Sequence, residues 1–136
     1  MPTRARLAFW LARGAPLVGV PFAFGAIHHV LAVASPSSND ASSWARHLVF
    51  VGINLFFGAV FAIRARWTIY PALLLAGQQV WSHGGAFLEA RRAGVFDGES
   101  FAVLCFLPLV LLGAWALHRA ARELAASTLL ESPPTR

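Results

Sequence analysis

Four long apolar stretches dominate this sequence, at residues 15–34, 44–63, 67–88 and 101–118. Each is close to the roughly 20 residues that an α-helix needs to cross a hydrocarbon core about 30 Å thick. The strands of a membrane barrel would be about half as long and would alternate apolar with polar residues, which these stretches do not. The sequence therefore predicts an all-α fold, a four-helix transmembrane bundle.

The composition agrees with a membrane protein. Hydrophobic residues make up 57% of the 136 residues and charged residues only 12%, which is too apolar for an ordinary soluble domain. All 11 basic residues are arginines, and the absence of lysine beside abundant alanine fits a GC-rich bacterial genome. We therefore expect residues 1–136 to form a single integral domain, a multi-pass protein of the bacterial inner membrane.

The distribution of arginines predicts the orientation of the bundle. Most of them lie before the first stretch, between the second and third, or after the fourth: Arg4, Arg6, Arg13, Arg64, Arg66, Arg119, Arg122 and Arg136. Only Arg46, Arg91 and Arg92 lie on the other side. Because cytoplasmic loops are enriched in basic residues, we expect an up-down-up-down bundle with both termini in the cytoplasm. The net charge of +5 is then a topology signal, and no polar basic domain is present that would bind nucleic acid.

A cleaved signal peptide is the alternative for the N-terminal region. Two early arginines, an apolar run and the small residues 32–34 resemble such a peptide and its cleavage site. Pro16 and Pro21 interrupt the apolar run, however, and two histidines lie where it should continue. We therefore expect the first helix to be retained, and an N-terminus at Ser35 would show the opposite.

The connections predict that helices adjacent in sequence are neighbours in space. Residues 35–43 form a polar, turn-forming segment, and the link at 64–66 is very short. Short links force adjacent antiparallel helices. The third connection, 89–100, is longer and charged. Trp44 and Trp67 begin predicted spans, where tryptophan typically anchors a helix at the membrane interface.

Histidines lie in three of the four apolar stretches at one predicted depth. His28 and His29 are near the end of the first stretch, His47 is near the start of the second, and His83 is near the end of the third. In an up-down bundle these positions meet at the extracytoplasmic face, about 5 to 7 Å inside the bilayer boundary at about 1.5 Å per residue. Ionisable groups inside a membrane are costly and usually face the bundle interior. The sequence therefore predicts a shared polar site in the outer leaflet.

Helical phase adds amide side chains to this site. Asn54 follows His47 by seven residues, which returns it to nearly the same face of the second helix. His28 and His29 point about 100° apart, so we expect only one of them to face the core. Five glycines of the first two helices are predicted to mark close packing between helices, namely Gly14, Gly19, Gly25, Gly52 and Gly58.

The third helix carries a polar stripe that is predicted to face its neighbours. Gln79, Ser82 and His83 are spaced i, i+3 and i+4, and Gln78 lies beside them. The opposite face carries Leu74, Trp81 and Leu88. Turning the amides outward would leave them in hydrocarbon, which is unfavourable. The candidate polar-site residues are therefore His28, His29, His47, Asn54, Gln78, Gln79, Ser82 and His83.

Three interpretations of this polar layer remain open. The first is structural: the side chains hydrogen-bond across helices and fix their register, which suits a structural or accessory protein. The second is a metal or haem site with His29, His47 and His83 as ligands and a carboxylate from Asp40, Glu89 or Asp97. The third is a pocket for a lipophilic molecule such as a quinone or lipid, whose polar head histidine and glutamine would orient.

The fourth stretch has few polar residues and is predicted to be a packing wall. Cys105 is the single cysteine, so it cannot form an internal disulfide, and we expect it to be a small buried hydrophobe. No nucleophile elbow or phosphate-binding loop is present, so whether the chain is an enzyme stays open. A small transporter subunit is a further alternative, although no span carries a central carboxylate.

Several short segments carry a resemblance to known proteins. The stretches 44–47, 52–54, 78–84 and 106–109 resemble small, uncharacterised four-span bacterial membrane proteins, and residues 25–29 are loosely similar to DoxX-type proteins. The resemblance implies a four-helix inner-membrane bundle and leaves its function open. The expected partners are the lipid bilayer and either further copies of the chain or a larger membrane complex.

Overall fold

A computed structural model describes residues 3–34 and 44–131, and these residues form four helices. The helices are α1 (Thr3–Ala34), α2 (Trp44–Ala62), α3 (Ile69–Arg92) and α4 (Gly98–Glu131). No strand is present in this part of the chain. The predicted all-α, four-helix fold is therefore confirmed. The polar segment 35–43, which includes Asp40, lies outside the described residues.

Three of these helices are long and apolar enough to cross a membrane, over Phe9–Ala34, Trp44–Ala62 and Gly98–Glu123. The helix α3 has 24 residues and is long enough, but its amides, serine and histidine lower its mean hydropathy. Composition therefore supports three of the four predicted spans, and the span at 67–88 is not supported on that ground. The helices also extend beyond the predicted limits of the first and fourth spans, because alanine, arginine and leucine continue a helix past its apolar part.

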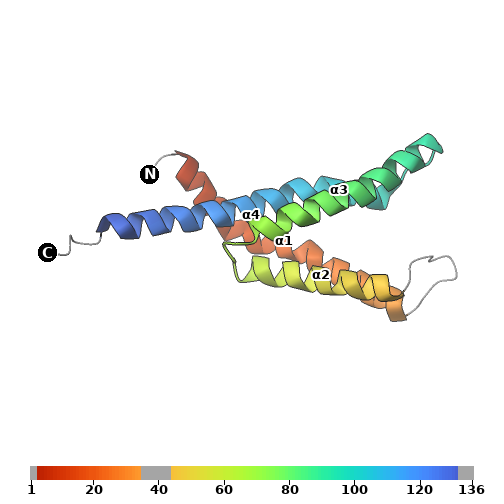
Figure 1. Cartoon of the computed structure of the whole chain (residues 1–136), viewed down its shortest axis with the longest axis horizontal. Helices are drawn as coiled ribbons and strands as arrows, with labels where there is room; N and C mark the ends of the chain where they lie inside the picture. Colours follow the sequence, from red (N-terminus) through yellow and green to blue (C-terminus); the bar gives the residue numbers. More distant parts are fainter. Residues whose placement is uncertain (1–2, 35–43, 132–136) are drawn as a thin grey trace.

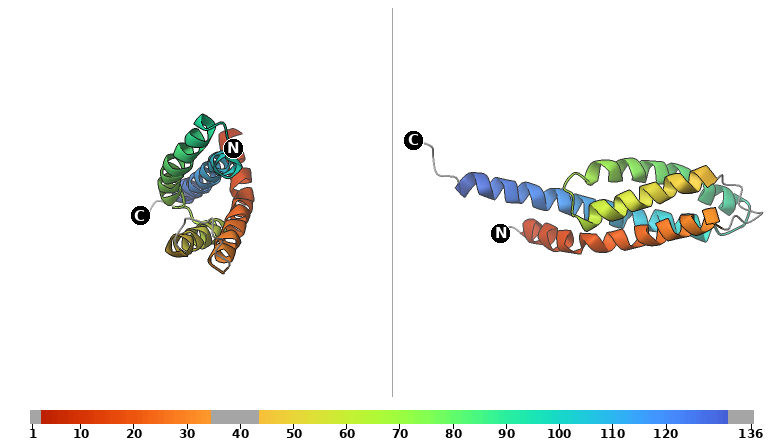
Figure 2. Two further views of the ribbon diagram at one scale, coloured as in Figure 1. Left: turned by 90° about the vertical axis from the view of Figure 1, so that its right-hand side faces the viewer. Right: turned by 90° about the horizontal axis from the view of Figure 1, so that it is seen from below.

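The helices pack as two pairs, α1 with α2 and α3 with α4, and the pairs are joined along α1 and α4. Figure 1 shows the pairs converging near the middle of the molecule and separating towards the end at which α1 ends and α4 begins. At the other end, α1 and α4 extend beyond the connection between α2 and α3 (Figures 1 and 2). The result is an elongated bundle that is closed in its middle and open at one end.

The buried core lies where the two pairs converge. Phe61 and Val110 are almost completely inaccessible, and Phe22 lies against them. The ring of Phe22 stacks on that of Phe57 with 5.2 Å between centroids, and the edge of Phe106 meets it at 5.5 Å. Aromatic pairs at these distances add stability beyond their buried area. This cluster holds α1, α2 and α4 together beneath the open end.

Glycine permits the close approach of α1 and α2 at two levels. A Cβ on Gly19 would lie 3.3 Å from the carbonyl oxygen of Gly58, and one on Gly25 would lie 3.0 Å from Cγ of Asn54. Small residues at such positions let two backbones pack closely. The prediction was wrong for Gly14 and Gly52, whose Cβ positions have no neighbour within 4 Å. Of the five predicted positions, close packing between α1 and α2 thus involves Gly19, Gly25 and Gly58.

Hydrogen-bonded turns end α2 and α3. After α2, Arg64 adopts a positive φ of 55°, and the amide of Ala65 donates to the Val60 carbonyl at 2.9 Å. After α3, Gly94 has a φ of 74° and the same bond pattern follows it. This left-handed arrangement satisfies carbonyls that a helix end leaves unpaired. The turn after α2 reverses the chain within a few residues, but α2 and α3 do not pack on each other. The prediction that this short link makes them packed neighbours was therefore wrong, because α3 packs on α4 instead.

Candidate ligand-binding cavity

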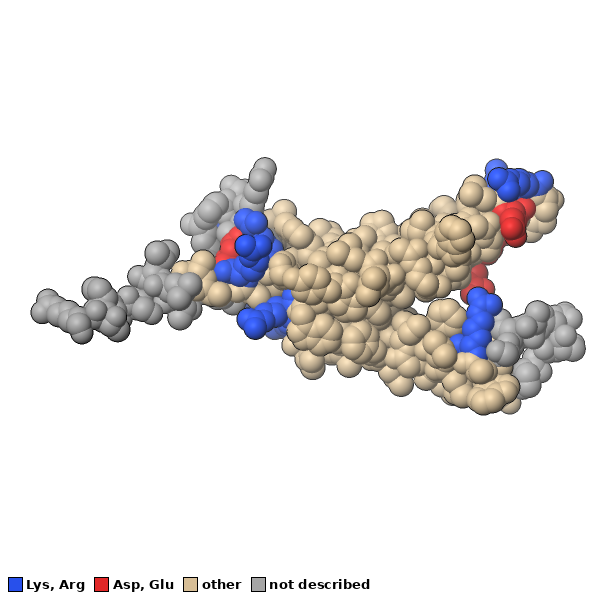
Figure 3. All heavy atoms as spheres, in the orientation of Figure 1, with Lys and Arg blue, Asp and Glu red and all other residues tan. Residues whose placement is uncertain are grey.

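The separation of the two helix pairs creates a cavity of about 800 Å³. All four helices contribute to its lining, and Figure 3 shows the notch by which it opens between the two arms of the molecule. An acidic and a basic side chain face each other across this notch, and the lining contains Glu99 and Arg46 as its charged residues. A cavity of this size suits a drug-sized or cofactor-sized molecule.

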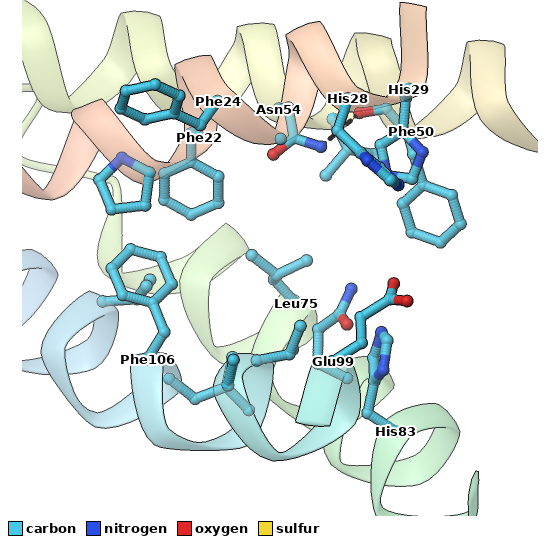
Figure 4. A pocket seen from close by; sticks show the side chains of 18 of the residues that line it. Phe22, Phe24, His28, His29, Phe50, Asn54, Leu75, His83, Glu99 and Phe106 are labelled. Atoms are coloured by element: carbon cyan, nitrogen blue, oxygen red, sulfur yellow. Dashed lines mark hydrogen bonds between the residues drawn. The ribbon is translucent and has the colours of Figure 1, made fainter. Parts of the chain in front are cut away.

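Polarity changes along the length of this cavity. At its inner end the side chains are aromatic and apolar, with Phe22 and Phe24 on one wall and Phe106 on the other (Figure 4). At the open end the walls carry His28, His29, His83 and Glu99 (Figure 4). The polarity of the lining therefore decreases along the cavity, from hydrogen-bonding side chains at the mouth to apolar side chains at the base.

A hydrogen bond between two histidines organises the wall formed by α1 and α2. The Nδ1 atoms of His29 and His47 lie 3.0 Å apart, so one of them donates a hydrogen and the other accepts it. The ring of His29 also stacks on Phe50 at 5.1 Å between centroids, and His28 meets it edge-on at 5.2 Å. The Arg46 guanidinium lies over the Phe50 ring, 5.8 Å from its centroid. The wall thus presents a row of aromatic rings with polar edges.

Asn54 continues the same wall towards the base of the cavity. Its side-chain amide donates to the Phe50 carbonyl at 2.8 Å, one helical turn earlier. Its carbonyl oxygen lies in the space that a Cβ on Gly25 of α1 would need. As the seven-residue spacing predicts, Asn54 and His47 both line the cavity. Asn54 is therefore held by its own helix on one side and by the glycine on the other.

A second histidine hydrogen bond organises the opposite wall, formed by α3 and α4. His83 Nδ1 lies 3.0 Å from the buried hydroxyl of Ser100, and the Ser100 amide donates to the Asp97 carboxylate at 3.0 Å. Hydrogen bonds from the Ser100 hydroxyl and amide hold the pKa of Asp97 below its ordinary value. Because the hydroxyl hydrogen is directed at Asp97, the serine oxygen accepts from His83. The ring of His83 is thereby fixed at the mouth.

Sequence reasoning missed the contribution of α4 to this site. We expected the last helix to start at Phe101 and to be a packing wall with few polar residues, but it begins at Gly98 and brings Glu99 and Ser100 to the cavity. The signal was present, because Asp97 is a preferred helix N-cap residue and Ser100 lies three positions later. Cys105 was also predicted to be buried, and it is exposed because this face of α4 is not covered by another helix.

The structure brings most of the predicted polar-site residues together. His28, His29, His47, Asn54, Gln79 and His83 line the cavity. Both adjacent histidines do so, rather than one of them. Gln78 and Ser82 do not line it and instead hydrogen-bond to each other on the surface of α3 at 3.3 Å. Gln79 is buried while Leu74, Trp81 and Leu88 are exposed, which confirms the predicted outward face of this helix.

The three histidines proposed as metal ligands are divided between the two walls. His29 and His47 bond to each other, whereas His83 bonds to Ser100. Within residues 3–34 and 44–131, no group of three or more histidine, cysteine, aspartate or glutamate side chains is placed to hold a metal ion. Of the carboxylates considered, Asp97 is engaged as the cap of α4 and Asp40 is not described.

No relative gives this chain a family. Comparison with protein-family models, with curated proteins and with solved structures finds no match. The similarity to DoxX-type proteins remains a prediction from short motifs. What the site does must therefore be argued from its own geometry.

Proposed function

We propose that this chain is a multi-pass protein of a bacterial inner membrane whose cavity binds a lipophilic molecule with a polar, carbonyl-bearing ring, the chemistry of a quinone. The observation that carries the proposal is the graded lining of the cavity, from histidine, amide and charged side chains at the mouth to phenylalanine at the base. An amphiphilic ligand matches such a gradient because each of its ends meets a surface of its own polarity.

The proposed topology is an up-down-up-down bundle with both termini in the cytoplasm. Three helices have the length and composition of spans, and α3 would complete the set because its buried Gln79 faces the other helices while leucine and tryptophan face outward. The arginines of α1, of the α2–α3 connection and of the far part of α4 belong to one end of the molecule (Figure 1). The positive-inside rule assigns that end to the cytoplasm and the cavity mouth to the outer leaflet.

The mouth offers hydrogen bonds from two sides to a ring placed between the walls. His28 and Arg46 on one wall carry N–H groups that can donate to a carbonyl oxygen. On the other wall the Nδ1 hydrogen of His83 is bonded to Ser100, so its Nε2 can accept from a hydroxyl group. The rings of His29 and Phe50 supply a stacked aromatic surface beside them. A planar ring with oxygen groups at opposite edges therefore fits this arrangement better than a compact metal ion does. An apolar tail attached to that ring would occupy the phenylalanine-lined base.

The two histidine hydrogen bonds support a ligand site more directly than a purely structural layer. The bond from His29 to His47 joins α1 to α2, and the bond from His83 to Ser100 joins α3 to α4. Each bond therefore fixes one helix pair. Neither of these two bonds joins one helix pair to the other.

Reconstitution with defined probes tests the proposal. Purified protein in nanodiscs of phosphatidylcholine would be titrated with decyl-ubiquinone, and in a parallel arm with dioleoyl phosphatidylglycerol as the competing lipid chemistry. We expect saturable quinone binding that the double variant His47→Phe, His83→Phe loses. Preference for the phospholipid over the quinone at this cavity would overturn the proposal. Purification of the protein from its native membrane would also show whether it is isolated as a homo-oligomer or as part of a larger complex.

A further inference from the structure

A second, smaller cleft lies at the opposite end of the molecule from the cavity mouth. It encloses about 260 Å³ between the start of α3 and the outer part of α4. Its lining consists of Arg66, Trp67, Tyr70, His118 and Arg122 with two alanines. The cleft therefore combines basic groups with large aromatic rings, whereas the cavity combines histidines with phenylalanines.

The two arginines of this cleft pair with none of the carboxylates that the structure describes. The neighbouring acid, Glu123, pairs with Arg119 at 2.8 Å on the surface of α4. Among the residues that the structure describes, the guanidinium groups of Arg66 and Arg122 form no ion pair. His118 Nδ1 lies 3.3 Å from the Arg66 carbonyl oxygen, so it donates to that oxygen and ties α4 to the connection before α3. The cleft is thus a fixed site with unneutralised positive charge.

The start of α3 adds little to this positive potential. The Thr68 hydroxyl donates to the Ala65 carbonyl, the Tyr70 amide donates to the Trp67 carbonyl at 3.2 Å, and Pro71 has no N–H. The positive charge of the cleft therefore comes from Arg66 and Arg122.

We propose that this cleft binds the phosphate-bearing head group of an anionic phospholipid at the cytoplasmic surface of the membrane. Trp67 and Tyr70 are 46% and 62% exposed, as expected for aromatic rings that lie among lipid head groups. Basic pockets between helices on the cytoplasmic side are suited to anionic head groups. The inference rests on the proposed orientation of the bundle and is independent of what occupies the larger cavity.

Native mass spectrometry of the full chain tests this site. Protein would be equilibrated with dioleoyl phosphatidylglycerol or dioleoyl phosphatidylcholine, and the dissociation constant of the retained lipid measured. We expect the variant Arg66→Gln, Arg122→Gln to bind phosphatidylglycerol about 30-fold more weakly, since each basic residue near an anionic surface contributes roughly fivefold. Binding of phosphatidylcholine should not change. Replacement of both residues by lysine should restore most of the affinity, which separates lost charge from lost folding.

Two controls make the result decisive. The variant Arg91→Gln, Arg92→Gln removes two exposed arginines at the opposite end of the bundle and should leave phosphatidylglycerol affinity unchanged. Equal loss in this variant, or unchanged binding in Arg66→Gln, Arg122→Gln, would overturn the proposal. A further arm adds inorganic phosphate as competitor. If free phosphate displaces the lipid at concentrations comparable with the lipid itself, the cleft is a phosphate site and the lipid assignment is wrong.

Discussion

His29 of α1 and His47 of α2 share a hydrogen bond, with 3.0 Å between their Nδ1 atoms. Such a bond requires that one Nδ1 carries a hydrogen and the other does not, so the two rings adopt complementary states. The pair stands at the mouth of the cavity and faces His83 from the other helix pair. It therefore does two things: it joins α1 to α2 and it sets the chemistry of one cavity wall.

The strength of this bond can be measured with a double-mutant cycle. We expect His29→Phe and His47→Phe to be coupled by about 1 kcal/mol, the order found for hydrogen bonds between helices in membranes. Reversible unfolding in mixed detergent and SDS micelles would give the free energies of the wild type, both single variants and the double variant. Strictly additive effects would show that the two rings do not bond.

The contact of Gly25 with Asn54 predicts a second stability effect. A methyl group on Gly25 would overlap the Asn54 amide, so Gly25→Ala should lower the free energy of unfolding by about 1 to 3 kcal/mol. Gly52→Ala is the matched control, because its Cβ has open space around it. Shortening the neighbour in Gly25→Ala, Asn54→Ser should recover part of the loss. A destabilisation of the Gly52 variant as large as that of Gly25→Ala would contradict the packing argument.

The cap of α4 predicts a pH dependence of stability. Hydrogen bonds from Ser100 lower the pKa of Asp97 from its ordinary 3.8, so the folded state favours the ionised carboxylate. Its contribution is fully present above the ordinary value and is lost as the pH falls through the lower folded value. Unfolding midpoints measured from pH 6 down to pH 2 should therefore fall more steeply for the wild type than for Asp97→Asn. Parallel curves would show that Asp97 does not stabilise α4.

Ser100 is predicted to position His83 for the ligand. In Ser100→Ala the backbone amide still caps on Asp97, but the ring of His83 loses its partner. We expect decyl-ubiquinone to bind about fivefold more weakly, the equivalent of one hydrogen bond of about 1 kcal/mol. The control is Ser82→Ala, which removes an exposed hydroxyl bonded to Gln78 outside the cavity. If Ser100→Ala and Ser82→Ala bind decyl-ubiquinone with equal affinity, Ser100 does not contribute to ligand binding.

The sequence predicted the helices and the polar layer because both depend on local patterns. Apolar length identifies a span, and the seven-residue spacing of His47 and Asn54 identifies a shared face without any knowledge of the neighbours. The outward face of α3 followed in the same way from the positions of Leu74 and Trp81. These are properties of a single helix, so no tertiary information was needed.

The openness of the bundle could not be predicted from those patterns. Whether polar side chains bridge a bundle or line a cavity depends on how far apart the helix pairs lie, and that separation is fixed by side-chain contacts between distant segments such as Phe22 and Phe106. The roles of Glu99 and Ser100 were missed because apolar length places the start of α4 too late. The exposure of Cys105 was missed because a lone apolar helix does not reveal which face lacks a neighbour.

The most direct test of the account is to fill the cavity. Ala102 lines the cavity on α4, so Ala102→Trp should occupy the space of the quinone ring, whereas Ala59→Trp places the same ring on an exposed face of α2. Affinities for decyl-ubiquinone would be measured for both variants in nanodiscs of phosphatidylcholine. We predict saturable binding by the wild type and the Ala59 variant, and binding at least about tenfold weaker in Ala102→Trp. Absence of binding by the wild type, or equal affinity in all three proteins, would contradict a quinone site in this cavity.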